Sequence, residues 1–360
     1  MEKWEIFHED LSLPGLSLDV HVFINSAEFP KNLMIEFHIA LEAIFRYRTG
    51  KTTITRINSS MTSHPSIPFG GPDKPETDLE DADIVILPLC YEADPSYGEG
   101  SQNGPIDLLV ASEQLECMDE ETWINWYQAR IFTTPFFFPS LPPETAVAKM
   151  KTQAARYLKQ NKFLLSLGGD HAITIGPVAA AAECYPGVGV LQIDAHMDLR
   201  NEWNGSPMNH ACVARRIIED CRCPVTQVGI RSFSEEEAIY LKQHELKPFF
   251  AHHIRETDDT WIDDVVNTLP EYVYITIDLD GLDPSEIPGT GTPEPGGLSY
   301  RQLIRLIKAV AKKRKVVAAD INELAKIPGT QVSEYTAAKI AVKLIVHCVM
   351  EKQAGDAFVS

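Results

Sequence analysis

Several features that would place this 360-residue chain in a familiar class are missing. No apolar run approaches the roughly 20 residues that are needed to cross a bilayer, so no membrane partner is expected. The first residues, 1–5, lack a basic segment followed by an apolar one, which predicts no signal peptide and a cytoplasmic protein. A glycine-rich phosphate loop of the Rossmann or Walker type is also absent, and nucleotide binding is therefore not supported.

Cysteines at the spacing of a disulfide framework or a zinc knuckle are lacking as well. The seven cysteines are odd in number and mostly scattered, which indicates reduced thiols. Cys221 and Cys223 form the one tight pair, but a single residue separates them and no second pair follows. This spacing does not match a zinc-binding motif.

Basic residues are in short supply, with 32 Lys and Arg against 51 Asp and Glu and a net charge of −19. Such a surface repels nucleic acid and anionic membranes, so neither is an expected partner. It is compatible with a small cationic substrate, although acidic surfaces also serve solubility alone. The hydrophobic share of 44% and the charged share of 23% are those of a globular protein with a large buried core.

Composition divides the chain into an N-terminal extension with a proline-rich linker, 1–80, and a larger domain, 81–360. In the extension, residues 20–24 are typical of a strand and residues 31–47 carry apolar side chains at helical spacing. Between residues 61 and 80, four prolines and two adjacent glycines exclude a helix or a central strand.

From residue 83 onward, short apolar runs alternate with helical patterns. Nearly continuous apolar strands, such as 188–193, indicate a sheet that is covered on both faces. The alternation predicts an α/β fold with a mostly parallel sheet and flanking helices. Strands are expected at 83–87, 163–167, 188–193, 225–229, 272–277 and 315–319, and helices near 105–117 and at 144–160, 173–184, 209–219, 234–243, 299–312 and 333–349.

Three short motifs rich in aspartate and histidine each follow a predicted strand. Because ligands bind at the carboxyl ends of the strands in an open parallel sheet, the three motifs should converge on one edge. One such motif alone is common in turns, but three at strand ends favour a functional site. The motifs are Gly168-Gly169-Asp170-His171, Asp194-Ala195-His196-Met197-Asp198 and Asp278-Leu279-Asp280-Gly281-Leu282-Asp283-Pro284.

The side chains expected to converge are four carboxylates and two imidazoles. Without cations the carboxylates would repel one another and their pKa values would rise, whereas two divalent ions would neutralise them. Oxygen-rich ligation without thiolate suits Mn²⁺, with Ni²⁺, Co²⁺, Fe²⁺ and Zn²⁺ as alternatives. Two ions roughly 3.5–4 Å apart could hold a water and lower its pKa. The candidate ligands are His171, Asp194, His196, Asp198, Asp278 and Asp280.

The motif set resembles the ureohydrolase superfamily of arginases, agmatinases and guanidinobutyrases, over about residues 82–350. Segments 96–98, 103–106 and 111–116 are similar to the N-terminal signature of its agmatinase-like branch, and 229–232 and 288–297 are also typical of the superfamily. The resemblance implies an arginase-like three-layer α/β/α sandwich, with 81–360 as the catalytic domain. It also implies a homo-oligomer, either a trimer or a hexamer.

The resemblance further implies roles for individual residues. Asp198 would orient a hydroxide held by the two ions, Mn²⁺ or Ni²⁺. His210 matches the histidine that protonates the departing amine, and Glu323 matches the carboxylate that pairs with the guanidinium. The alternatives are a surface histidine and a solvated loop glutamate. One ion is assigned to His171, Asp194, Asp198 and Asp278, and the other to Asp194, His196, Asp278 and Asp280, with Asp194 and Asp278 bridging.

The implied reaction is hydrolysis of a small guanidino compound to urea and an amine or ammonia. Agmatine and free guanidine are the leading substrates. Guanidinobutyrase or arginase activity, a formiminoglutamate hydrolase-like relative and a non-catalytic binding protein are alternatives. Arginase is disfavoured because its loop for the substrate carboxylate is not evident after Asp198. Departures from the common pattern are Lys326, Ala211-Cys212, the long extension and Trp203, which could restrict the pocket to a small substrate.

Overall fold

The computed structural model describes residues 4–13, 16–25, 66–139, 142–255 and 257–352. The chain forms two compact units, 1–65 and 66–360. In the first unit, β1 (Trp4–Leu13) and β2 (Leu16–Asn25) pair as antiparallel strands, and β2 includes the strand that was expected at 20–24. The helix expected at 31–47 lies outside the described residues.

Residues 66–80 group with the second unit and, as their prolines predict, carry no helix or strand. Phe69 is buried edge-on against Trp126, with ring centroids 5.6 Å apart. Gly70 and Gly71 adopt positive φ angles of 86° and 67°, which glycine tolerates best. Packing of this segment on the unit thus depends on a turn that the glycines allow.

The second unit is built on one eight-stranded sheet in which every pair of neighbouring strands is parallel. Its four central strands are buried along almost their whole length, which explains their continuous apolar sequences. In spatial order the strands are β4 (Ile131–Thr133), β3 (Ile84–Leu89), β5 (Phe163–Gly168), β10 (Lys315–Asn322), β9 (Tyr272–Asp278), β6 (Gly189–Ile193), β7 (Val225–Ile230) and β8 (Phe249–Phe250).

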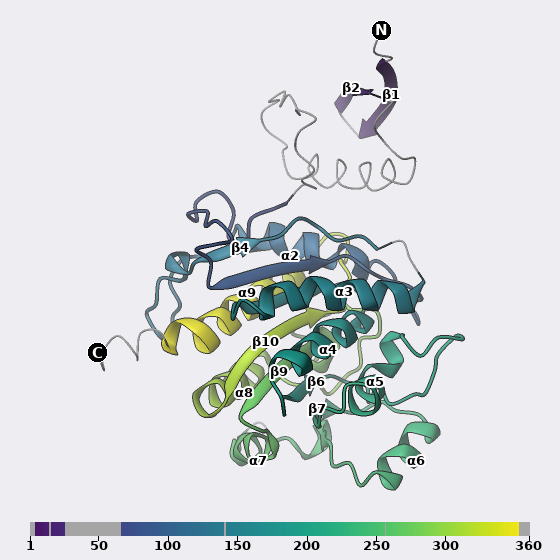
Figure 1. The fold of residues 1–360 in the computed structure, drawn as a ribbon, viewed down its shortest axis with the longest axis vertical. Coiled ribbons are helices and arrows are strands. Elements are labelled where there is room, and N and C mark those ends of the chain that lie inside the picture. Colours follow the sequence, from purple (N-terminus) through teal and green to yellow (C-terminus); the bar gives the residue numbers. More distant parts are fainter. Residues whose placement is uncertain (1–3, 14–15, 26–65, 140–141, 256, 353–360) are drawn as a thin grey trace. The chain divides into compact units, whose positions relative to one another are not determined.

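Helices cover both faces of this sheet, which confirms the predicted three-layer sandwich. Helix α3 (Pro143–Leu158) packs on α4 (Ile175–Cys184) in front of the sheet in Figure 1, and α4 also contacts α5 (Val213–Glu219). Behind the sheet lie α8 (Tyr300–Lys313) and α9 (Val332–Ile345), which contact each other (Figure 1). The other α-helices of the described residues are α2 (Gly104–Ser112), which packs on α9, α7 (Thr260–Thr268), which packs on α8, and α6 (Glu235–Gln243).

A local sequence signal explains where α6 begins. Ser234 begins α6 with a capping box, in which Ser234 Oγ accepts from the Glu237 amide and Glu237 Oε2 accepts from the Ser234 amide.

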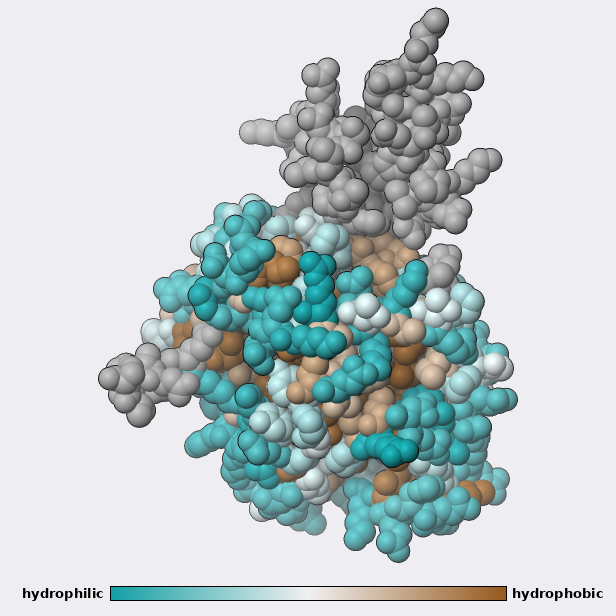
Figure 2. Space-filling model, in the orientation of Figure 1, coloured by the Kyte–Doolittle hydropathy of each residue, from teal (hydrophilic) through white to brown (hydrophobic). Residues whose placement is uncertain are grey.

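Among the described residues, no helix is both long and apolar enough to cross a membrane. Figure 2 shows that the visible face of this unit is mainly hydrophilic, with smaller apolar patches between polar side chains.

Candidate metal centre and active site

The three acidic motifs follow strands that lie side by side in the sheet. β6 pairs with β9, and β10 pairs with both β9 and β5, so the carboxyl ends of these strands meet at one edge. Two glycines allow the chain after β5 to approach that edge closely. A Cβ on Gly168 would lie 1.9 Å from Asn322 Oδ1, and one on Gly169 would lie 2.0 Å from Tyr91 O. The expected convergence of the motifs is therefore observed.

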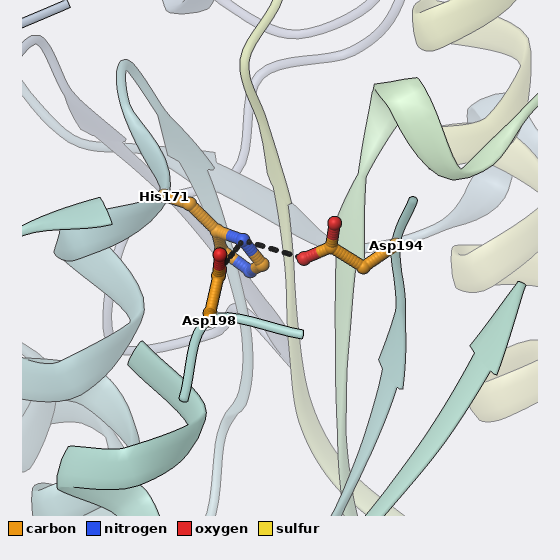
Figure 3. A group of neighbouring side chains, drawn as sticks. All are labelled: His171, Asp194 and Asp198. Carbon is orange, nitrogen blue, oxygen red and sulfur yellow. Dashed lines mark ion pairs between the residues drawn. The ribbon is translucent and has the colours of Figure 1, made fainter. Parts of the chain in front are cut away.

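The first cluster surrounds the imidazole of His171. Its Nδ1 lies 3.1 Å from Asp194 Oδ2, 3.1 Å from Asp198 Oδ2 and 3.3 Å from Asp278 Oδ2. Figure 3 shows the ring pointing toward the carboxylates of Asp194 and Asp198. His171 Nδ1 is buried without a hydrogen-bond partner, whereas Nε2 is hydrogen bonded to Thr276 Oγ1 at 2.8 Å. A ring that donates from Nε2 keeps a lone pair on Nδ1, as a metal ligand requires.

The second cluster consists of His196, Asp280 and again Asp194. His196 Nδ1 lies 2.9 Å from Asp280 Oδ2 and 3.7 Å from Asp194 Oδ1. Asp194 therefore offers one oxygen to each cluster. Asp278 faces the first cluster through Oδ2, and its Oδ1 accepts a hydrogen bond of 2.9 Å from the Asp280 amide.

The electrostatics of these clusters favour a bound cation. Burial, with the charge of Asp194 added, raises the pKa of Asp198 to about 7. Burial also raises the pKa of Asp278 well above its ordinary range, and the charges of Asp280 and Asp194 add to the shift. Within the described part of the chain, no lysine or arginine side chain forms an ion pair with these carboxylates. The oxygen and imidazole donors thus fit divalent metal ions.

The backbone at the site carries strain of the kind found at functional positions. Asp198 and Glu323 are non-glycine residues with φ angles of 51° and 66°. Glu323 Oε1 accepts a hydrogen bond of 2.7 Å from the amide of His171, and the Glu323 amide donates to Gly169 O at 2.8 Å. These two bonds hold the loop after β10 against the loop after β5, and they place the Glu323 carboxylate next to the first cluster.

Polar residues inside the strands support the ligands from behind. Gln192 Nε2 donates to Asp194 Oδ2 at 2.7 Å, and Gln227 Nε2 donates to Gln192 Oε1 at 3.0 Å. Together with Thr276, these residues were not among the expected site residues. In the sequence, each of these residues is a polar side chain inside an otherwise apolar strand. Such a side chain indicates a supporting role near a site, because a buried amide or hydroxyl needs a hydrogen-bond partner.

A cavity of about 280 Å³ opens above the clusters. His210 lies on its wall, with Nε2 hydrogen bonded to Ser96 Oγ at 2.8 Å, and burial together with the nearby histidines lowers the pKa of His210 to about 4. Asp194 lies fully buried and is not among the residues that line the cavity. All the other predicted site residues line this cavity: His171, His196, Asp198, His210, Asp278, Asp280 and Glu323.

Aromatic side chains form part of the cavity wall. Tyr97, Trp203 and Phe233 line it, and Tyr97 is 85% exposed. The guanidinium of Arg200 lies 4.4 Å from the centre of the Trp203 ring, in a cation–π contact that favours this position of the ring. Trp203 and Glu92 also line a second, adjoining hollow of about 620 Å³, so they form the partition between the two.

Comparison with known proteins agrees with this geometry. The model of the arginase family matches residues 82–350. An N(1)-aminopropylagmatine ureohydrolase of Synechocystis is 35% identical, with 75% of this chain and 90% of the relative covered, and an agmatinase of Pyrococcus horikoshii is 33% identical, with 75% and 94% covered. The crystal structure of an agmatine ureohydrolase of Thermoplasma volcanium superposes with a TM-score of 0.69 at 28% identity, with 76% of this chain and 92% of that chain covered. The chain belongs to the arginase family and is a ureohydrolase.

Proposed function

We propose that this chain is a binuclear-metal hydrolase that cleaves a C–N bond of a small guanidino compound and releases urea with an amine or ammonia. The observation that carries the proposal is the pair of clusters that share Asp194 beneath one cavity. Both clusters contain the donor types that hold Mn²⁺ or Ni²⁺. The ligands are proposed to be His171, Asp194, His196, Asp198, Asp278 and Asp280.

The chemistry needs a strong nucleophile next to a weak electrophile. A guanidinium carbon resists attack by water because its charge is spread over three nitrogens. Two bound ions would supply Lewis-acid activation of a water at this site. Asp198 is proposed to orient that water by accepting a hydrogen bond from it. The backbone holds Asp198 in the left-handed region.

Glu323 and His210 are proposed to handle the substrate on the cavity walls. A carboxylate can accept two parallel N–H bonds from a guanidinium, and the His171 amide already fixes one oxygen of Glu323. The lowered pKa keeps His210 neutral before the reaction, so the ring would take up a proton from the attacking water and pass it to the departing nitrogen, because an amine leaves readily only when protonated. Its hydrogen bond to Ser96 Oγ orients the ring toward the cavity.

Agmatine is the first candidate substrate, since relatives at 33–35% identity carry the names agmatinase and N(1)-aminopropylagmatine ureohydrolase. Free guanidine is the second candidate, because the bulky Trp203 side chain forms part of the cavity wall, which favours a small substrate. The small cationic substrate would be the main partner, and the charge of −19 supports the prediction that nucleic acid is not one. We also propose a homo-oligomer, trimer or hexamer, and a cytoplasmic location, which seven free thiols support.

The test is urea release by protein loaded with Mn²⁺ or Ni²⁺, measured in parallel on agmatine, guanidine, guanidinobutyrate and arginine. We expect about two ions per chain by elemental analysis and the fastest turnover with agmatine or guanidine. Glu323→Gln should raise KM or abolish turnover while both ions remain bound, because it removes the charge that faces the guanidinium. Protein that carries two ions and releases urea from none of the four substrates would refute the proposal.

A further inference from the structure

An arginine beside the metal centre donates to backbone carbonyl groups instead of to carboxylates. Arg231 follows β7, belongs to the segment 229–232 noted in the sequence, and is half-buried. Its guanidinium makes six hydrogen bonds: Nε to Pro295 O at 3.1 Å, Nη1 to Gly229 O at 3.0 Å and Gly281 O at 3.4 Å, and Nη2 to Asp280 O at 2.6 Å, Leu282 O at 3.2 Å and Glu294 O at 2.6 Å.

These bonds join three segments of backbone that are far apart in the sequence. They are the end of β7, residues 280–282 after β9, and residues 294–295. The middle segment contains Asp280 of the second cluster. The last belongs to the loop that holds Thr292, whose Oγ1 donates to Asp280 Oδ2 at 3.2 Å. Arg231 therefore fixes both the main chain of Asp280 and the loop that contacts its carboxylate.

The loop packs closely around the guanidinium at Gly297. A Cβ on Gly297 would lie 2.5 Å from the Leu282 carbonyl carbon, 2.6 Å from the Asp283 amide nitrogen and 2.7 Å from Arg231 Nη2. Asp283 Oδ2 accepts hydrogen bonds from the amides of Gly296, at 2.7 Å, and Gly297, at 3.3 Å. Only glycine at position 297 permits this approach.

We propose that Arg231 is a positioning residue for Asp280 and so sets the metal affinity of the cluster that contains His196 and Asp280. The inference rests on the metal-binding role proposed above. Five N–H groups in a planar fork can serve several carbonyl oxygens at once, whereas a lysine offers three donors at one point. Among the described residues, the Arg231 side chain donates to no residue of the first cluster. Its backbone amide donates to Ala195 O at 2.8 Å, a bond that substitution of the side chain does not remove.

The test compares Arg231→Met and Arg231→Lys with the wild type by calorimetric titration of metal-free protein with Mn²⁺. The wild type should take up two ions per chain. Arg231→Met should bind one ion with wild-type affinity and the other about 10–100-fold more weakly, in line with the loss of an outer contact. Arg231→Lys retains some of the hydrogen-bond donors, so its affinity for the weaker-bound ion should lie between those of the wild type and Arg231→Met.

Arg314 offers a matched control. It is also half-buried and donates to main-chain carbonyl oxygens, at Leu269 and Val266, at the end of α7. Arg314→Met should lower the melting temperature and leave both metal affinities unchanged. The inference is overturned if Arg231→Met binds both ions as the wild type does, or if Arg231→Met and Arg314→Met weaken metal binding alike. A wild type that binds two ions but releases no urea would instead count against the proposed function.

Discussion

Two acidic clusters that contain buried carboxylates are balanced in opposite ways. Between α9 and the loop after α2, Lys343 Nζ is fully buried, 2.6 Å from Asp119 Oδ2 and 2.9 Å from Glu120 Oε1. In the candidate metal centre, the ion-pair partners of the carboxylates among the described residues are the imidazoles of His171 and His196. The first group carries its own cation as a side chain, whereas the second leaves room for a cation from solution. A buried acidic group therefore indicates a site only where the fold supplies no lysine or arginine.

The pKa values show the same contrast. Burial tends to raise the pKa of Asp119, but hydrogen bonds from Lys343 and Thr122 outweigh it and hold the pKa at about 2. The pKa of Asp198 is raised to about 7, chiefly by burial. Groups of the chain itself thus stabilise the first carboxylate as an anion, whereas an added cation would favour the anionic form of the second.

The largest effect is expected from Asp194→Asn, because this residue contributes an oxygen to both clusters. Loss of its charge should lower the metal content from two ions toward none and slow urea release by at least about 10³-fold. Metal analysis and a urea assay measure the two effects. The control is Asp119→Asn, the same change in the lysine-balanced group, which should retain both ions. Full metal content and turnover in Asp194→Asn would contradict the contrast between the lysine-balanced group and the candidate metal centre.

A smaller effect, on stability, is expected from Lys343→Met. It leaves the fully buried Asp119 carboxylate without its cation, which costs about 3 kcal/mol of unfolding free energy. Thermal and urea unfolding of the metal-loaded protein provide the measurement. Lys308→Met is the control, since Lys308 is about half-exposed where it pairs with Glu121, and its loss should cost about 0.5 kcal/mol or less. Equal losses in the two variants would contradict the assigned role of Lys343.

The smallest effect concerns acid stability. Because the folded pKa of Asp119, about 2, lies below the unfolded value, its contribution is present above about pH 4 and is lost as the pH falls toward 2. The loss should be about 2 kcal/mol. Metal-free wild type and Asp119→Asn are compared by unfolding between pH 6 and 2, so that release of ions does not contribute. A steeper acid loss in the variant than in the wild type would reverse the prediction.

Much of the fold could be predicted from the sequence because the central strands are buried on both faces. Two edge strands, β4 and β8, were missed, since three and two residues are too few to show a period. The nine-residue helix α7 was missed as well; so short a helix depends on packing, in this case on α8. β10 runs to Asn322 rather than 319, because Asp320 is satisfied inside the sheet by the hydroxyl of Tyr274 at 2.6 Å.

The candidate ligands could be predicted because each belongs to a motif directly after a strand. The supporting residues could not, because their partners are distant in the sequence. Ser96 meets His210 across 114 positions, and Thr276 meets His171 across 105. Arg231 stood in a segment similar to the family, but the resemblance named no role for it. Only the strand order shows which of these pairs become neighbours.

The place of β10 in the sheet has a consequence for biosynthesis. It is the last strand of the residues that the structure describes, yet it lies between β5 and β9, and it leads directly into Glu323. Until residues 315–322 have left the ribosome, the strands that carry His171 and Asp278 have no common neighbour to align them. The first cluster, which joins residues after β5 to the end of β9, can therefore form only in a nearly finished polypeptide.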